Sequence, residues 1–143
     1  MSRRKEIRTL MDGETLDPAF RERLMLAVTA VNACRYCSYA HTRRALEEGI
    51  SQEEIKALAT GAFDGCPPEQ VEALCYAQHW AESNGHPDPA ARLRVLELYG
   101  ERKLAAMELA LRMIRAGNLW GNTLDWFLYH LSFGRWGGKN WRN

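Results

Sequence analysis

The chain has 143 residues, and its 19 lysines and arginines almost balance its 18 aspartates and glutamates. This length is typical of one domain with a sizeable core, so we expect a single domain over residues 1–143. A net charge of +1 supplies no overall field for nucleic acid or an anionic membrane, and we exclude both as main partners.

The start of the chain predicts no targeting segment. Residues 1–15 are rich in charge and lack the apolar run of a secretory signal. The longest mostly apolar stretch, residues 24–31, is too short to span a membrane. We therefore expect a cytoplasmic protein, in which a closely spaced cysteine pair indicates redox or metal chemistry before a structural disulfide.

The sequence patterns predict an all-α protein. Residues 1–16 are expected to be an N-terminal arm or a short helix, and Asp17-Pro18 is a helix start, with a capping side chain before a proline. That helix should reach about residue 33. Later helices are expected from Cys34 to Gly49, from Ser51 to about Phe63, from Pro68 to Ser83, from Asp88 to Tyr99, and from Gly100 to Ala116, where Gly117 should end the helix. An aromatic segment over 119–133, suited to a core or a subunit interface, and a mobile tail over 134–143 follow.

The helix over residues 17–33 has apolar residues on two sides, which predicts burial on both sides. Glu22 lies in line with Leu26 and Thr29 on one of these sides. A carboxylate in such a place loses water, and carboxylates with this kind of environment are candidate acids or bases. Glu22 is therefore a candidate site residue.

Cys34, Cys37 and His41 follow one another at spacings of three and four residues. Residues at these spacings share one face of a helix, so the imidazole would lie over the second sulfur. Glu22 precedes Cys34 by 12 residues, about 18 Å along a straight helix, and can approach only if the chain turns back. A turn at residues 32–33 would make an antiparallel helix pair and bring His41 toward Glu22.

Glu22, His41 and Cys37 would then form a proton relay. Glu22 would orient His41, which would take the proton of the Cys37 thiol directly or through a water. A nearby base and the helix N-terminus would both favour the thiolate, the form that acts as a nucleophile.

The pattern Glu22-x11-Cys34-x2-Cys37-x3-His41, with the helix end after it, resembles the alkylhydroperoxidase D and carboxymuconolactone decarboxylase superfamily over about residues 20–63. The resemblance implies an all-helical bundle with an antiparallel helix pair that carries the CxxC at a helix N-terminus, often assembled as trimers or hexamers. It also implies a hydroperoxide substrate, no bound cofactor or metal, and an external lipoyl-like dithiol or lipoylated protein as reductant. Cys37 would be the peroxidatic thiol, Cys34 the resolving thiol, and Glu22 with His41 the relay.

One position differs from the family pattern. Members of the alkylhydroperoxidase D type have a histidine just before the second cysteine, where this chain has Tyr36. The difference leaves general disulfide exchange open beside peroxidase turnover.

Other interpretations remain open for the cysteines. They could be inert core thiols, or Cys34, Cys37 and His41 could bind zinc with help from Cys75 and His79. Two further functions also fit the fold: a lactone decarboxylase, which needs no redox cysteine, and a non-enzymatic interaction protein whose oligomer or partner responds to oxidation of the pair.

Overall fold

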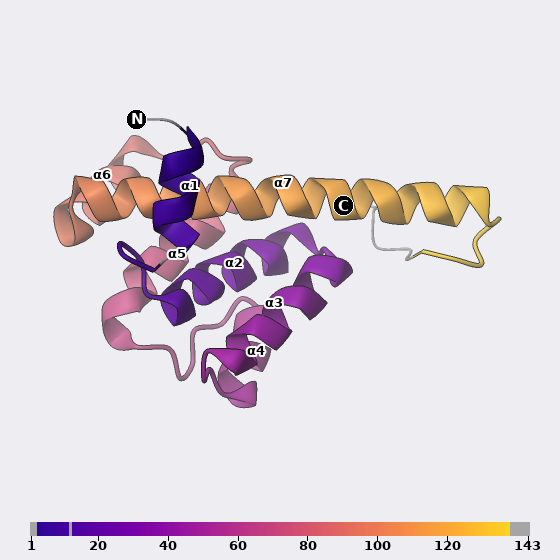
Figure 1. Cartoon of the computed structure of the whole chain (residues 1–143), viewed down its shortest axis with the longest axis horizontal. Coiled ribbons are helices and arrows are strands. Elements are labelled where there is room, and N and C mark those ends of the chain that lie inside the picture. The colour runs from indigo at the N-terminus through magenta and orange to yellow at the C-terminus, as the bar shows by residue number, and fades with distance from the viewer. Residues whose placement is uncertain (1–2, 12, 138–143) are drawn as a thin grey trace.

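The computed structural model describes residues 3–11 and 13–137, and within them the chain is all-α, with seven helices and no strand. The helices are α1 (Arg3–Met11), α2 (Pro18–Asn32), α3 (Arg35–Glu47), α4 (Gln52–Ala59), α5 (Pro68–Glu82), α6 (Pro89–Tyr99) and α7 (Glu101–Leu131). Figure 1 shows six shorter helices gathered around one part of the long α7. The predicted all-α class is confirmed.

Helix α2 begins and ends as the sequence predicts. The Asp17 carboxylate accepts a hydrogen bond of 3.1 Å from the Phe20 N–H, and Pro18 occupies the first turn, where its missing N–H has no cost. The helix ends at Ala33, whose φ of 51° is left-handed and turns the chain back. The predicted turn at residues 32–33 is therefore confirmed.

Helix α2 is also the centre of the core, because it contacts α3, α4, α5 and α7. Its apolar residues are buried on both sides, as predicted. The largest fully buried side chains come from α2, from the segment before it and from the surrounding helices: Leu16, Phe20, Leu24, Leu58, Leu74, Leu104, Met107 and Leu111. Burying each such side chain contributes about 1.5–3 kcal/mol, so this helix is held firmly as a platform for the site.

The prediction that a helix ends at Gly117 is wrong. Helix α7 continues through it to Leu131 and is 31 residues long in all. A glycine ends a helix when it takes the left-handed conformation, and neither Gly117 nor Gly121 has a positive φ. Both have helical geometry, and both face the sulfur atoms of Cys34 and Cys37, where a larger residue would approach those atoms.

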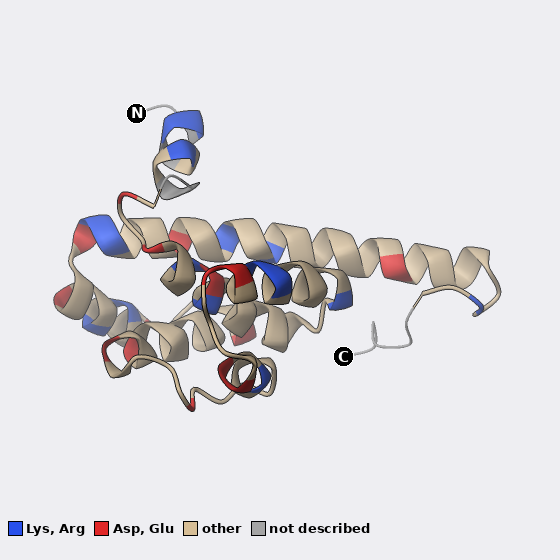
Figure 2. Cartoon of the chain, turned by 60° about the horizontal axis from the view of Figure 1, so that its bottom comes forward, with Lys and Arg blue, Asp and Glu red and all other residues tan. Residues whose placement is uncertain are grey.

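The second half of α7 projects beyond the other helices (Figure 1). The aromatic segment predicted for a core or an interface does not lie in the core: its large apolar side chains are exposed, namely Leu119, Trp120, Leu124, Trp126, Phe127, Leu131 and Phe133, with Trp136 after them. Figure 2 shows few charged residues along this half of the helix. Residues 138–143 of the predicted tail lie outside the described residues. None of the described helices combines the length and apolar character that crossing a membrane requires.

Candidate dithiol site

The two cysteines meet at the N-terminus of α3. Cys34 is the N-cap, and its sulfur accepts a hydrogen bond of 3.4 Å from the backbone N–H of Cys37. The two sulfur atoms lie 2.9 Å apart and share a hydrogen bond, and both thiols are free. Cys34 is only 1% exposed, whereas Cys37 is partly exposed. An incoming reagent therefore reaches Cys37 first, with Cys34 directly behind it.

Glu22 and His41 lie in contact, which confirms the geometry expected from the sequence. The Glu22 Oε2 atom is 2.6 Å from His41 Nδ1, and the two residues are 1% and 8% exposed. The other carboxylate oxygen lies 3.5 Å from Nε of Arg21. If Glu22 is ionised its carboxylate can only accept, and then Nδ1 carries the imidazole proton and Nε2 is the basic nitrogen. The catalytic roles of these residues stay predictions.

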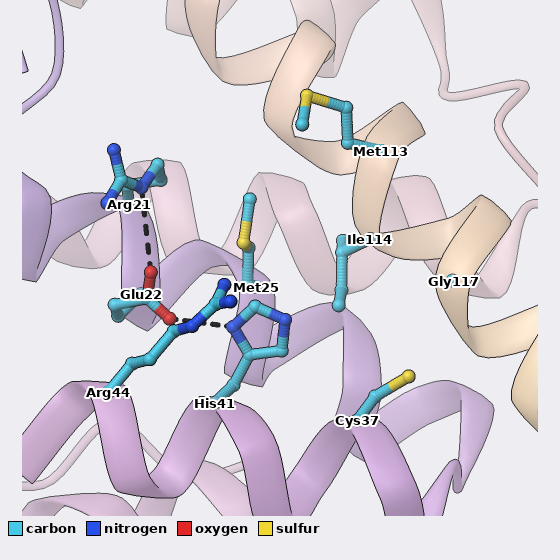
Figure 3. Close-up of a pocket in the computed structure, with 9 residues that line it drawn as sticks. All are labelled: Arg21, Glu22, Met25, Cys37, His41, Arg44, Met113, Ile114 and Gly117. Carbon is cyan, nitrogen blue, oxygen red and sulfur yellow. Dashed lines mark hydrogen bonds and ion pairs between the residues drawn. The ribbon is translucent and has the colours of Figure 1, made fainter. Parts of the chain in front are cut away.

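A pocket of about 170 Å³ joins these groups. In Figure 3 the His41 ring lies between the Glu22 carboxylate and Cys37. The lining residues come from α2, α3 and α7: Arg21, Glu22, Met25, Cys37, His41, Arg44, Met113, Ile114 and Gly117. Within the described residues no hydrogen bond joins the imidazole to either sulfur, so a proton passes between them only through a water or a small substrate, for which the pocket has room.

The Cys37 thiol holds its proton more firmly than the sequence analysis expected. Burial raises the pKa of Cys37 to about 11, the hydrogen bond with Cys34 adds to this rise, and a hydrogen bond from Asn118 opposes it. The helix N-terminus does not correct this, because the Cys37 N–H points at the Cys34 sulfur. Burial therefore opposes the thiolate expected at Cys37, which needs a base at the moment of reaction.

Helix α7 supplies a wall of the site that the sequence analysis missed. A Cβ atom added at Gly121 would lie 2.6 Å from the Cys34 sulfur, and one at Gly117 would lie 3.9 Å from the Cys37 sulfur. Contacts below 3.0 Å do not occur without a shift, so Gly121 is the residue that lets the dithiol approach α7. The Gly-x3-Gly spacing within a helical pattern is the signal that could have indicated this close packing.

Polar residues of the same helix hold the turn that carries the cysteines. The buried Asn118 bonds to Asn32 and Thr29, and Asn122 donates to the Asn32 carbonyl at 2.8 Å.

Further along α7, Asp125 accepts hydrogen bonds from Arg35 at 2.6 Å and from the Tyr36 hydroxyl at 3.0 Å. Tyr36 is therefore tied to α7, and no sequence signal pointed to this contact.

The remaining cysteines and histidines lie elsewhere. Cys66 is buried beside Glu54, and burial raises its pKa to about 12. Cys75 is exposed, and His79 contacts Asp88. Among the residues that the structure describes, no three His, Cys, Asp or Glu side chains are grouped closely enough to hold a metal ion, so the zinc interpretation has no ligand set.

Comparison with known proteins gives one match. A sequence model described as the carboxymuconolactone decarboxylase family matches residues 3–79, which is 77 of the 143 residues and contains Glu22, Cys34, Cys37 and His41. Searches of curated proteins and of solved structures find nothing that matches.

Proposed function

Because this chain belongs to the carboxymuconolactone decarboxylase family, which includes decarboxylases and peroxidases, we propose that it is a thiol-dependent hydroperoxidase of the alkylhydroperoxidase D-like type. The observation that supports this most is the buried Glu22–His41 pair, 2.6 Å apart, on a pocket that Cys37 also lines. A lactone decarboxylase needs no thiol. Here the Cys37 thiol has a base, His41, on the same pocket and a second thiol, Cys34, in contact.

The first step takes place at Cys37. His41 accepts the thiol proton through a bridging water or the peroxide itself, and the Cys37 thiolate attacks one oxygen of the O–O bond. The S–O bond forms as the O–O bond breaks, so Cys37 becomes a sulfenic acid and the other oxygen leaves as an alkoxide. The protonated His41 returns a proton to that alkoxide, while Glu22 stabilises the imidazolium.

The second step forms the disulfide. The Cys34 sulfur, 2.9 Å from that of Cys37 in the reduced protein, attacks the sulfenic acid and a water leaves. An external dithiol, of the lipoyl kind or carried on a lipoylated protein, then exchanges with the disulfide and is itself oxidised to a disulfide. No bound cofactor or metal takes part in this scheme.

Consumption of a hydroperoxide in the presence of a dithiol tests the proposal. Cys37→Ser should abolish consumption, Cys34→Ser should leave a sulfenate that dimedone traps, and Cys75→Ser is the matched control and should change nothing. Unchanged turnover in the first two variants would contradict the proposal. Decarboxylation of a carboxylated lactone that survives alkylation of all thiols would support a decarboxylase instead.

We also propose that copies of the chain associate through the exposed stripe of α7. Trp120, Leu124, Phe127 and Leu131 recur at spacings of four, three and four residues, which is the pattern of a helix that packs against another helix, and each is at least 42% exposed. Two of the four are aromatic side chains of about 150–250 Å² each, so the stripe offers on the order of a few hundred Å², and an interface of ~800 Å² per partner would include the surface beside it. A low density of charge along the stripe fits a like partner (Figure 2).

Sedimentation tests the association. Trp120→Glu together with Phe127→Glu should give monomers, while the control Tyr39→Glu, an aromatic 72% exposed on α3, should leave the assembly intact. A monomeric parent protein would contradict the proposal.

A redox-responsive interaction protein is the second candidate function, because the dithiol packs on α7 at Gly121, next to the first residues of this stripe. In that case oxidation would change the sedimentation of the parent protein while hydroperoxide is not turned over.

A further inference from the structure

Asn118 is one of the three residues of α7 that lie between Gly117 and Gly121, the two glycines that face the dithiol. Asn118 follows Gly117 directly and is completely buried. Cβ atoms built at Gly117 and Gly121 would lie 3.9 and 3.8 Å from the Cys37 sulfur, so this stretch of backbone runs beside that sulfur. The base, His41, belongs to α3, the same helix as Cys37. Helix α7 is a second element that approaches the Cys37 sulfur.

The Asn118 side chain forms two hydrogen bonds with residues of α2. Its Oδ1 accepts from Asn32 Nδ2 at 3.0 Å, and its Nδ2 donates to Thr29 Oγ1 at 3.1 Å. An amide nitrogen carries two hydrogens, so one N–H remains after the bond to Thr29. The Asn118 amide also lowers the pKa of Cys37 against the effect of burial, which is the effect of a donor near the sulfur.

We propose that Asn118 is a catalytic residue whose second N–H donates to the Cys37 sulfur and stabilises the thiolate as His41 removes the proton. The proposal rests on the proposed function in so far as that thiolate is the nucleophile. An amide suits this task because it is neutral, does not titrate and can only be a donor at its nitrogen. A hydrogen bond to a charged sulfur is stronger than one to a neutral thiol, so the bond favours ionisation. The bonds to Thr29 and Asn32 hold the amide in place and leave its second N–H for the sulfur.

The test measures ionisation of Cys37 itself, apart from any turnover. In a background of Cys34→Ala, Cys66→Ser and Cys75→Ser, Cys37 is the remaining thiol, and the chemical shift of its ¹³C-labelled Cβ reports its charge as pH is raised. Asn118→Leu keeps a similar volume without a donor. Asn118→Asp can accept from Asn32 and from the Thr29 hydroxyl, but has no N–H for the sulfur. Asn122→Ala is the matched control, since Asn122 also bonds to Asn32 from α7.

We expect the midpoint of Cys37 to rise by about one pH unit in both Asn118 variants, a tenfold loss of thiolate below the midpoint. The control should keep the parent midpoint. The Asp variant adds a negative charge that raises the midpoint by itself, so the neutral Leu variant decides whether the lost donor matters. A midpoint equal to the parent in the Leu variant would overturn the proposal.

A measurement on the background protein covers the case in which the Asn118 variants do not fold. The side-chain amide protons of Asn118, assigned through its Cα and Cβ atoms, should shift with the same midpoint as Cys37. Amide signals that do not follow the titration would overturn the proposal. If these results hold while hydroperoxide is not consumed, the proposed function fails and the donor role stands.

Discussion

The site has two halves of different origin, and the contrast between them is instructive. The half made by α2 and α3 holds the reactive groups, the base and its carboxylate, and lies within residues 3–79, where the family model matches. The half made by α7 adds Met113, Ile114 and Gly117 to the pocket lining and places Gly121 and Asn118 beside the thiols, with no ionisable group of α7 among them. The first half supplies the chemistry, and the second sets the distance and the environment of the thiols.

The effect of pH on Cys37 gives the largest expected change and tests the environment that both halves create. With a pKa of about 11, the thiolate fraction of Cys37 rises about tenfold for each pH unit from 7 to about 10. The alkylation rate should rise in the same proportion, because the thiolate is the reacting form. Trypsin cleaves after Arg35 and separates the two cysteines, so mass spectrometry follows each. A rate that levels off below pH 8 would show that Cys37 is not a desolvated thiol.

Loss of the base tests the α2–α3 half alone. His41→Gln keeps an N–H for the buried Glu22 carboxylate but has no basic nitrogen, so the protein should fold while proton transfer fails. We expect oxidation of Cys37 by hydroperoxide to slow by about 10²–10⁴-fold at neutral pH. The loss of free thiol after rapid mixing with hydroperoxide measures this rate. The control is Thr42→Ala, one residue along, and a loss below tenfold in His41→Gln would remove the imidazole from the mechanism.

A pair of substitutions tests the α7 half. Alanine at Gly117 makes an ordinary contact 3.9 Å from the Cys37 sulfur, and should stabilise the helix by about 0.5–1 kcal/mol. Alanine at Gly121 would place its Cβ 2.6 Å from the Cys34 sulfur, so the dithiol or the helix must move, at a cost of about 1–3 kcal/mol. Urea unfolding of both variants measures the difference. Equal stability of the two would mean that Gly121 does not set the approach of the dithiol.

The two halves also differ in how far the sequence predicts them. Caps at Asp17 and Cys34 act within a few residues, and the turn at Ala33 follows from the spacing of Glu22 and His41, so local patterns were enough. The bonds from α7 to Asn32 and Thr29 join residues 86–90 positions apart, and no spacing rule reaches that far.

The wrong prediction that a helix ends at Gly117 has the same origin. Glycine is a helix breaker by its intrinsic preference, and only the sulfur atoms packed against Gly121 show why it is kept within the helix. The raised pKa of Cys37 likewise depends on burial that the helix pattern of α3 alone does not show. Local pattern therefore predicted the reactive half, and tertiary packing decided its reactivity.

The central claim is that one hydroperoxide molecule converts the reduced pair into a Cys34–Cys37 disulfide by way of Cys37. One equivalent of hydroperoxide added to the reduced protein, followed by intact mass and tryptic peptides, tests it directly. We predict a loss of two hydrogens and a cross-link between the peptides that end at Arg35 and begin at Tyr36, with Cys66 and Cys75 still free. Oxidation spread over all four cysteines, or a protein that hydroperoxide leaves reduced, would contradict the account.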